Sequence, residues 1–305
     1  MPINHRPCFN WKLRSRTLRL GERTLVMGIL NATPDSFSDG GRFLDPRAGV
    51  DHALQMLDEG ADLIDLGGES TRPNAAPISL EEEQARVLPV LRAILAARPD
   101  TIISIDTYHA ETARRAVEAG AEIVNDVSGL LWDDAMAVAC AALHCGAVLM
   151  HTRGRPREWR DLPSLAADEV TPLVQRELKE RAEAALAAGI ARDAIALDPG
   201  FGFGKAHDEN YPLLVHLNDL HTLGFPLLIG LSRKAFLRHT LAQTLPNSVQ
   251  ASSQSQALED ATLAANTASI LAGAHILRVH DIAPTRAAAT IADRVLASAG
   301  PQASA

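Results

Sequence analysis

The sequence has 305 residues, of which 47% are hydrophobic and 22% are charged. These proportions are typical of a globular protein and exclude a largely disordered chain, which requires low hydrophobicity and high charge. The 37 acidic residues outnumber the 29 lysines and arginines, giving a net charge of −8. An acidic chain repels phosphate backbones, so we expect no general nucleic-acid binding, while a local basic pocket for a small phosphate ligand stays compatible with the charge.

The cysteines and the apolar runs indicate in which cellular compartment the protein is expected. Cys8, Cys140 and Cys145 are too few, and odd in number, for a disulfide framework, and they lack the paired spacing of a zinc site. No apolar run reaches the roughly 18–20 residues of a membrane helix. Residues 1–12 lack the apolar stretch of a signal peptide. The sequence therefore predicts a cytoplasmic protein with reduced thiols and no membrane contact.

The first predicted element precedes the main apolar runs. Residues 10–23 alternate weakly between apolar and polar side chains, with a turn expected at Gly21 and Glu22. This pattern predicts a short N-terminal hairpin that covers one end of the fold.

Eight short apolar runs follow, each ending in polar residues. Such nearly continuous runs are typical of strands that are buried on both faces. They are Thr24–Asn31, Leu63–Glu69, Thr101–Asp106, Ile123–Ser128, Ala147–Thr152, Ile195–Gly200, Pro226–Ser232 and Ile276–Asp281.

Helical patterns separate these runs, which predicts parallel βαβ units. The helices are expected at Pro46–Glu59, Ser79–Ala97, Ala110–Ala119, Thr171–Ala188 and Asp260–Ala272. Eight βα units in about 300 residues favour a (β/α)₈ TIM barrel, an α/β fold. A doubly wound open sheet is the alternative, but it usually carries a glycine fingerprint after the first strand, which residues 28–33 lack.

We see no domain boundary, so we expect a single barrel domain over residues 1–305. Its core is expected at about residues 24–298, followed by a frayed tail at residues 299–305. The segment Gln243–Gln256 is rich in Ser and Gln and is expected to be an exposed, mobile insertion before the last helix.

Polar residues stand where each strand would run into its loop, which is where barrel enzymes carry their chemistry. Charge at a buried strand end is costly unless it is paired, so a ring of such residues points to a polar ligand. The residues are Asn31, Glu69, Asp106, Asn125, His151, Asp198, Ser232, Lys234, Arg278 and His280.

This set is chemically mixed. Asp106, Asn125 and Asp198 suit the N–H groups of a flat heterocycle, and Lys234 suits an acceptor on its ring. The cationic and donor groups of Arg72, Arg278 and His280 suit phosphate oxygens. The neutral oxygen of Asn31 is a ligand that Mg²⁺ accepts beside phosphates and waters.

Several polar residues have simpler explanations. We expect Glu69 to support its loop and His151 to be a hydrogen-bonded core histidine. Arg153, Arg155, Arg157 and Arg160 most simply form a solvated loop face. The glycine-rich segment 198–205 fails the spacing of a phosphate loop, so its glycines are expected to permit tight turns, with Phe203 as an aromatic wall.

Seven segments resemble the signatures of the dihydropteroate synthase family, and they follow one another in order from residue 27 to residue 281. They are MGILNATPDSFSDGG (27–41), DLGGESTRP (65–73), IDT (105–107), VNDVSG (124–129), LDPGFGFGK (197–205), GLSRK (230–234) and RVHD (278–281).

The resemblance implies the joining of 4-aminobenzoate to (7,8-dihydropterin-6-yl)methyl diphosphate, which gives 7,8-dihydropteroate and diphosphate in folate synthesis. It implies that the pterin is held by Asp106, Asn125, Asp198 and Lys234, with Met150 also in the substrate site. Arg278 and His280 would bind the diphosphate, and Asn31 would bind Mg²⁺ on it. Thr71, Arg72, Pro73, Phe203 and Ser232 would bound the aminobenzoate pocket.

The catalytic residues implied are Asp106, Lys234, Arg278, His280 and Arg72. The loops 31–41 and 70–76 together contain Gly, Pro, Ser and Asp, so we expect them to be mobile and to close over the substrates. The resemblance further implies inhibition by sulfonamides and a homodimer. The chain departs from the family pattern at Asn74, at His151–Gly154 and at Gln243–Gln256. A pterin-binding methyltetrahydrofolate methyltransferase and a non-catalytic pterin-binding paralogue are the alternatives.

Overall fold

Eight parallel strands form the centre of the protein. The computed structural model describes residues 6–32, 46–69, 77–244 and 247–299, without the side chains of residues 46 and 247–255. Hydrogen bonds join the strands in the order β8-β7-β6-β5-β4-β3-β10-β9, and a bridge between Leu197 and Leu227 links the two outermost strands. The TIM barrel is therefore confirmed. The strands are β3 (Leu25–Asn31), β4 (Leu63–Gly67), β5 (Ile103–Asp106), β6 (Ile123–Asp126), β7 (Gly146–Met150), β8 (Ile195–Asp198), β9 (Leu228–Ile229) and β10 (Ile276–Val279).

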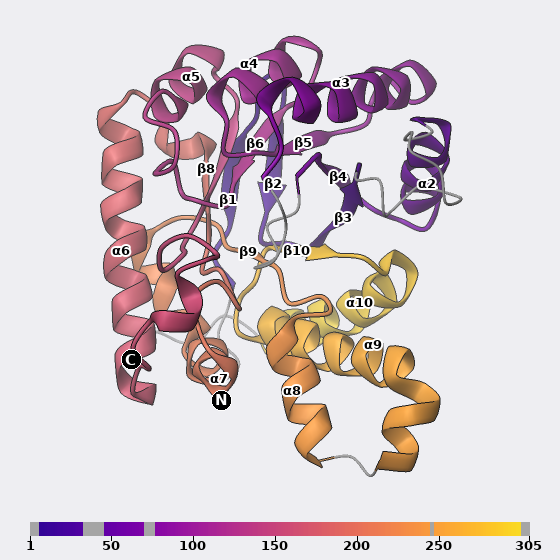
Figure 1. The fold of residues 1–305 in the computed structure, drawn as a ribbon, viewed down its shortest axis with the longest axis vertical. Coiled ribbons are helices and arrows are strands. Elements are labelled where there is room, and N and C mark those ends of the chain that lie inside the picture. Colours follow the sequence, from indigo (N-terminus) through magenta and orange to yellow (C-terminus); the bar gives the residue numbers. More distant parts are fainter. Residues whose placement is uncertain (1–5, 33–45, 70–76, 245–246, 300–305) are drawn as a thin grey trace.

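Helices surround these strands and follow one another in chain order, from α2 on the right of Figure 1, over the top, down the left side to α7 at the bottom and on to α10 at the lower right. Because each helix returns the chain to the start of the next strand, all strands of the sheet run parallel. The helices are α2 (Pro46–Asp58), α3 (Leu80–Ala97), α4 (Ala110–Glu118), α5 (Met136–Leu143), α6 (Ala167–Ala187), α7 (Asn210–Val215), α8 (Ala235–Thr244), α9 (Asn247–Leu271) and α10 (Ile282–Ser298).

The main apolar core lies between the sheet and the helices, where strand residues such as Ile64 and Leu149 pack among helix residues such as Leu91 and Val174. Local signals fix where the helices begin. Helix α3, for example, begins after Ser79, whose side-chain oxygen accepts a hydrogen bond from the Glu82 amide at 3.2 Å. Capping and apolar burial thus agree on the same element boundary.

The predicted N-terminal hairpin exists, and it closes one end of the barrel. Strands β1 (Phe9–Lys12) and β2 (Thr17–Leu20) pair antiparallel. The fully buried Trp11 packs with the lower interior of the barrel, and its indole Nε1 donates to the Ala194 carbonyl at 2.9 Å. Gly146 makes room for this lid, since a Cβ there would lie 2.7 Å from Leu13 Cδ2.

Two local predictions are wrong. The hairpin turns at residues 13–16, where the Leu13 amide donates to the Arg16 carbonyl at 2.8 Å, and not at Gly21. Residues 247–256, expected in an insertion separate from the following helix, are instead the first turns of α9. No glycine or proline stands between Asn247 and Leu271, so a helix favoured at its apolar end can extend through the Ser- and Gln-rich part.

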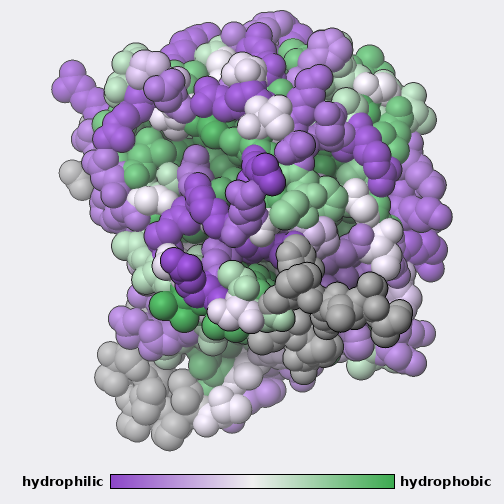
Figure 2. Space-filling view, turned by 180° about the vertical axis from the view of Figure 1, so that it is seen from behind, coloured by the Kyte–Doolittle hydropathy of each residue, from purple (hydrophilic) through white to green (hydrophobic). Residues whose placement is uncertain are grey.

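Hydrophilic side chains cover most of the face shown in Figure 2, with apolar side chains visible between them. Cys8, Cys140 and Cys145 are free. Within the described ranges, no helix combines the length and the apolar character needed to span a membrane.

A buried histidine below the barrel gives a testable dependence of stability on pH. His275 is fully buried, and its Nδ1 accepts the Leu227 amide at 3.1 Å while its Nε2 lies 2.9 Å from the Pro7 carbonyl. Burial lowers its pKa to about 3, whereas an unfolded histidine titrates near about 6.5. As the pH falls from about 6.5 toward 3, this histidine therefore becomes protonated in the unfolded chain but stays neutral in the folded chain. The free energy of unfolding falls over the same range, by up to about 1.4 kcal/mol per pH unit.

We expect His275→Asn to lower the free energy of unfolding at pH 7 by about 1–3 kcal/mol, because the bond to Pro7 is lost. The same variant should show a shallower loss of stability between pH 6.5 and 4 than the wild type. Urea unfolding at several pH values measures both effects. Parallel pH profiles of the two proteins would refute the assignment to His275.

Candidate functional site

The inward-facing positions of the strands change from apolar to polar along the barrel axis. At the hairpin end they are Met27, Ile123, Val148, Leu228 and Ile276, which pack together with Trp11. Polar groups stand further along the strands of the barrel, at its opposite end, which we call the mouth. Every second side chain of a strand points to the same face, so the polar residues point into the barrel like the apolar residues nearer the hairpin. These polar residues are Asn31, Asp65, Asp106, Asn125, Asp198 and Arg278.

Arg278 joins two carboxylates at the mouth. Its Nε donates to Asp65 Oδ2 and its Nη2 donates to Asp106 Oδ2, both at 2.5 Å. Burial lowers the pKa of Arg278, but Asp65 and Asp106 together raise it above its ordinary value. Burial raises the pKa of Asp106, which Arg278 opposes and the Asp65 carboxylate reinforces. The mouth thus contains a cation bonded to two acids.

Asp65 is a candidate site residue that the sequence analysis did not single out. It is fully buried, and its Oδ2 also accepts Asn125 Nδ2 at 3.0 Å. Its Oδ1 has no hydrogen-bond partner, and neither does the hydroxyl of Ser104, the residue beside it on β5. The available signal was its spacing, since Leu63, Asp65 and Gly67 share one face of β4. Asp65 orients both Asn125 and Arg278.

Asp198 ends β8 across the mouth. Its Oδ1 accepts the Gly200 amide at 2.7 Å. Burial raises its pKa to about 6, and burial lowers the pKa of Lys234 to about 8, each countered by the charge of the other. Between these values both groups are charged, so they present an acceptor and a donor to a polar ligand.

The glycine-rich loop after β8 carries an aromatic wall. The Phe203 ring lies 3.9 Å from Lys234 Nζ, a cation–π contact. Gly200 has a φ of +66°, and a Cβ there would lie 1.9 Å from the His151 carbonyl oxygen, so the tight turn requires glycine. Lys205 points inward and donates to the Gly200 carbonyl at 2.7 Å. The glycines of this loop thus permit tight turns and close packing, as expected.

Ser232 and His280 form a pair between the last two strands. Ser232 Oγ lies 2.9 Å from His280 Nδ1 and also accepts the His280 amide at 3.3 Å. Between Ser232 and Lys234, Arg233 adopts a positive φ of 57°. Its Nη2 contacts Asp281 at 2.7 Å and Glu259 at 3.3 Å. These contacts hold the turn that carries Ser232 and Lys234.

Some of the remaining predicted site residues lie in the described part of the chain, and others lie outside it. Asn31 ends β3, and its neighbour across the strands is Gly67, which in turn lies beside Asp106. Met150 ends β7 next to Asp198 and is buried. Thr71, Arg72, Pro73 and Asn74 lie outside the described residues, as do most of the two loops expected to close.

Most of the polar residues for which we expected a structural role have such a role in the fold. The Tyr108 hydroxyl donates to Glu69 at 2.9 Å. His151 is fully buried and its Nε2 lies 3.1 Å from Glu177, while its Nδ1 has no partner. In the basic segment, Arg155 lies over the Trp132 ring at 4.9 Å. Arg153 contradicts the solvated-face prediction, because its side chain is 11% exposed and bonded to backbone carbonyls.

One group in the described part of the chain, Glu69, Glu83 and His109, has ligand atoms close enough for a metal ion. Both Glu83 oxygens are already used, however, by Thr107 at 2.7 Å and by Thr112 at 2.6 Å, and His109 Nδ1 lies 3.0 Å from Oε2. Glu83 therefore serves as a buried hydrogen-bond acceptor that secures the chain directly after Asp106.

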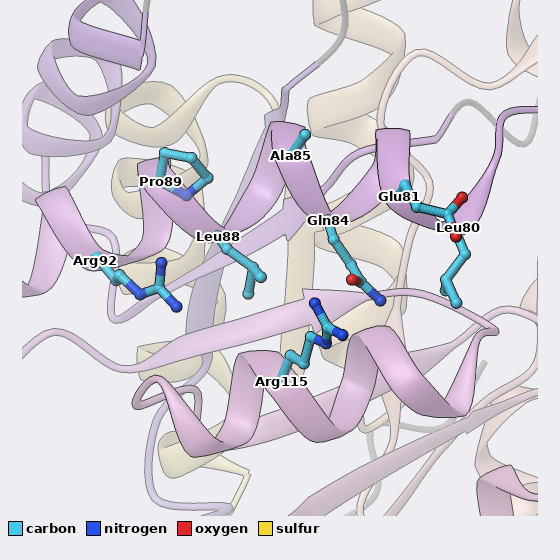
Figure 3. A pocket seen from close by; sticks show the side chains of 8 residues that line it. All are labelled: Leu80, Glu81, Gln84, Ala85, Leu88, Pro89, Arg92 and Arg115. Carbon is cyan, nitrogen blue, oxygen red and sulfur yellow. The ribbon is translucent and has the colours of Figure 1, made fainter.

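A groove of about 360 Å³ lies between α3 and α4, lined by residues such as Leu88, Pro89 and Arg115 (Figure 3). A second one of about 560 Å³ lies beside α6 and includes Lys179 and Phe225. Neither shares a lining residue with the mouth, so neither competes with it as the polar site.

Comparisons with known proteins agree with this geometry. A family model described as pterin binding enzyme matches residues 27–280. Dihydropteroate synthase of Clostridium beijerinckii is 40% identical over 286 residues, which is 93% of this chain and 99% of that protein.

Solved structures give the same result. A structure of Xanthomonas albilineans dihydropteroate synthase with 4-aminobenzoic acid has a TM-score of 0.83 and 41% identity, covering 95% of this chain and 99% of the other. A structure of the Yersinia pestis dihydropteroate synthase with a sulfonamide drug complex has a TM-score of 0.83 and 39% identity, covering 95% of this chain and all of the other.

Proposed function

The chain belongs to the pterin-binding enzyme family, and on that premise we infer that it has the activity of dihydropteroate synthase. It joins 4-aminobenzoate to (7,8-dihydropterin-6-yl)methyl diphosphate, giving 7,8-dihydropteroate and diphosphate. The observation that carries this conclusion is the mouth itself, where Arg278 lies between Asp65 and Asp106 at 2.5 Å from each. This arrangement combines acids for a heterocycle with a cation for a diphosphate.

The pterin lies between the acids of the mouth. Asp198 and Asn125 accept and donate along its amino-pyrimidinone edge, Lys234 donates to a ring acceptor, and Met150 packs beside Asp198. A pterin that reaches Asp106 displaces the Arg278 guanidinium from it, while Asp65 keeps hold of Nε. The freed Nη groups of Arg278 then face the diphosphate with His280.

Bond formation depends on where charge develops. As the C–O bond to the diphosphate breaks, positive charge grows on the exocyclic methylene, and the Asp106 carboxylate stabilises it. Arg278 and His280 stabilise the departing diphosphate. The amine of 4-aminobenzoate is neutral at pH 7 and attacks the methylene directly, once Phe203 and Ser232 hold its ring in place. The C–N bond forms as the C–O bond breaks, and the nitrogen then loses one proton to water or to the departing diphosphate. Thr71 and Arg72 complete this proposed pocket.

The donor set at Asn31 fits Mg²⁺. Asn31 offers one neutral oxygen at the mouth, and Gly67 beside it lets the Asp106 side chain approach closely, since a Cβ there would lie 3.3 Å from Asp106 Cβ. Mg²⁺ takes one or two protein oxygens and completes its shell with phosphates and waters. When bound there, it would neutralise charge on the diphosphate.

The test is diphosphate release. We expect release only when the pterin diphosphate, 4-aminobenzoate and Mg²⁺ are all present, with equimolar dihydropteroate. Methyl transfer from a reduced folate, without diphosphate release, would instead identify a methyltransferase. Tight pterin binding without turnover would identify a non-catalytic pterin-binding protein.

We further propose a single-domain protein that forms a homodimer in the cytoplasm. Ile291 and Val295, one turn apart on α10, are 67% and 41% exposed, which supports a contact between copies. The three free cysteines support a reducing compartment. Light scattering of the purified protein, with Ile291→Glu as a disrupting variant, tests the dimer.

A further inference from the structure

Arg153 follows β7 and lies outside the groups assigned to the substrates. Its Nη1 donates to the Gly204 carbonyl at 3.0 Å and its Nη2 donates to the Pro163 carbonyl at 2.9 Å. Only 11% of the side chain is exposed. The planar guanidinium therefore links the segment after β7 to the glycine-rich loop after β8.

Glu209 completes this link. Its side chain is 9% exposed, and its Oε2 lies 3.7 Å from Arg153 Nη1. The same carboxylate accepts the Ala206 amide and the Leu165 amide, each at 2.8 Å. One ion pair thus holds both backbone segments together, and removing either partner would leave a poorly solvated charge.

Phe203 is the residue whose position these bonds determine. Its amide donates to the Gly200 carbonyl at 3.1 Å, and its own carbonyl accepts Lys205 Nζ at 3.3 Å. The next residue, Gly204, packs so closely that a Cβ there would lie 2.6 Å from Arg153 Cβ.

The ring of Phe203 is fixed from both sides. It lies 3.9 Å from Lys234 Nζ, and its centroid lies 5.3 Å from that of Trp159, edge to face. Arg153 and Glu209 hold the backbone on the outer side of the loop, and Lys205 holds it on the inner side. The pair therefore acts on the wall of the mouth without reaching into it.

We propose that Arg153 and Glu209 are positioning residues that set the Phe203 wall of the 4-aminobenzoate pocket. This inference rests on the proposed function. Asp106, Asn125 and Arg278 are held by a separate hydrogen-bond network. Asp198 and Lys234 contact the loop through the Gly200 amide and the Phe203 ring, so loosening the wall weakens the second substrate more than the pterin.

The test compares Arg153→Met with Arg157→Met, a change of the same kind at an exposed arginine of the same segment. We expect Arg153→Met to raise the KM for 4-aminobenzoate by roughly 5- to 30-fold, the effect of losing charged hydrogen bonds. Its kcat should stay within about 2-fold, the Kd for a pterin should rise less than this KM, and Arg157→Met should match the wild type.

Two further variants sharpen the result. Glu209→Gln should raise the same KM, and the double variant should be no worse than the more affected single variant, because both changes act on one loop. Arg153→Lys keeps the charge but loses the two-pronged geometry, so it should be intermediate and serves if Arg153→Met fails to fold.

Equal KM values for Arg153→Met and Arg157→Met would overturn the proposal. So would a parallel loss of kcat, pterin affinity and melting temperature, because that pattern indicates a general structural role. Failure of the wild type to release diphosphate would overturn the proposed function instead, and is a separate result.

Discussion

Arg278→Ala should lower kcat/KM by roughly 10²- to 10³-fold, the usual effect of removing a group that stabilises developing charge. The guanidinium is the cation bonded to both Asp65 and Asp106, and in the proposed reaction it stabilises the leaving diphosphate. Steady-state diphosphate release with both substrates measures the effect.

The same change should also destabilise the fold. It leaves the fully buried Asp65 carboxylate without its cation, which costs roughly 3–5 kcal/mol. Arg278→Lys retains a positive charge but cannot bond to both carboxylates with a planar guanidinium. Compared with Arg278→Ala, it should therefore recover more stability than activity. Wild-type kcat/KM in Arg278→Ala would remove this residue from the mechanism.

Asp198→Ala should weaken pterin binding by roughly 30- to 1000-fold, because the heterocycle loses a buried charged acceptor. Calorimetric titration with a pterin measures the Kd directly. Since burial raises the pKa of Asp198 to about 6, the carboxylate becomes protonated below that pH, and wild-type pterin affinity should fall as the pH drops below about 6.

Asp198→Asn is the matched control. It keeps an oxygen for the Gly200 amide but loses the charge, so its Kd should lie between those of the wild type and Asp198→Ala, with a weaker dependence on acidic pH. Unchanged pterin affinity in both variants would place the ring elsewhere.

The barrel could be predicted from the sequence because strand pattern and helix pattern agree along the whole chain. Each apolar run became a strand buried on both faces, and its polar end came to the mouth, as for Asp106 and Asp198. Parallel strands bring their carboxyl ends together, so the gathering of these side chains follows from topology.

What could not be predicted depends on contacts between distant segments. Asp65 lies in mid-strand among apolar neighbours, and its role follows from Arg278, 213 residues further along. Arg153 belongs to a basic run typical of a solvated loop, and only the fold brings Gly204 and Pro163 within its reach. Helix α9 extends through polar residues because a helix, once formed, propagates cheaply.

A crystal structure with a bound pterin tests the central claim most directly. We predict the ring inside the mouth, its amino-pyrimidinone edge on Asp198 and Asn125, with Arg278 parted from Asp106 but still bonded to Asp65. A pterin bound outside the mouth, or an Arg278–Asp106 bond that persists with the ring excluded from the barrel, would contradict it.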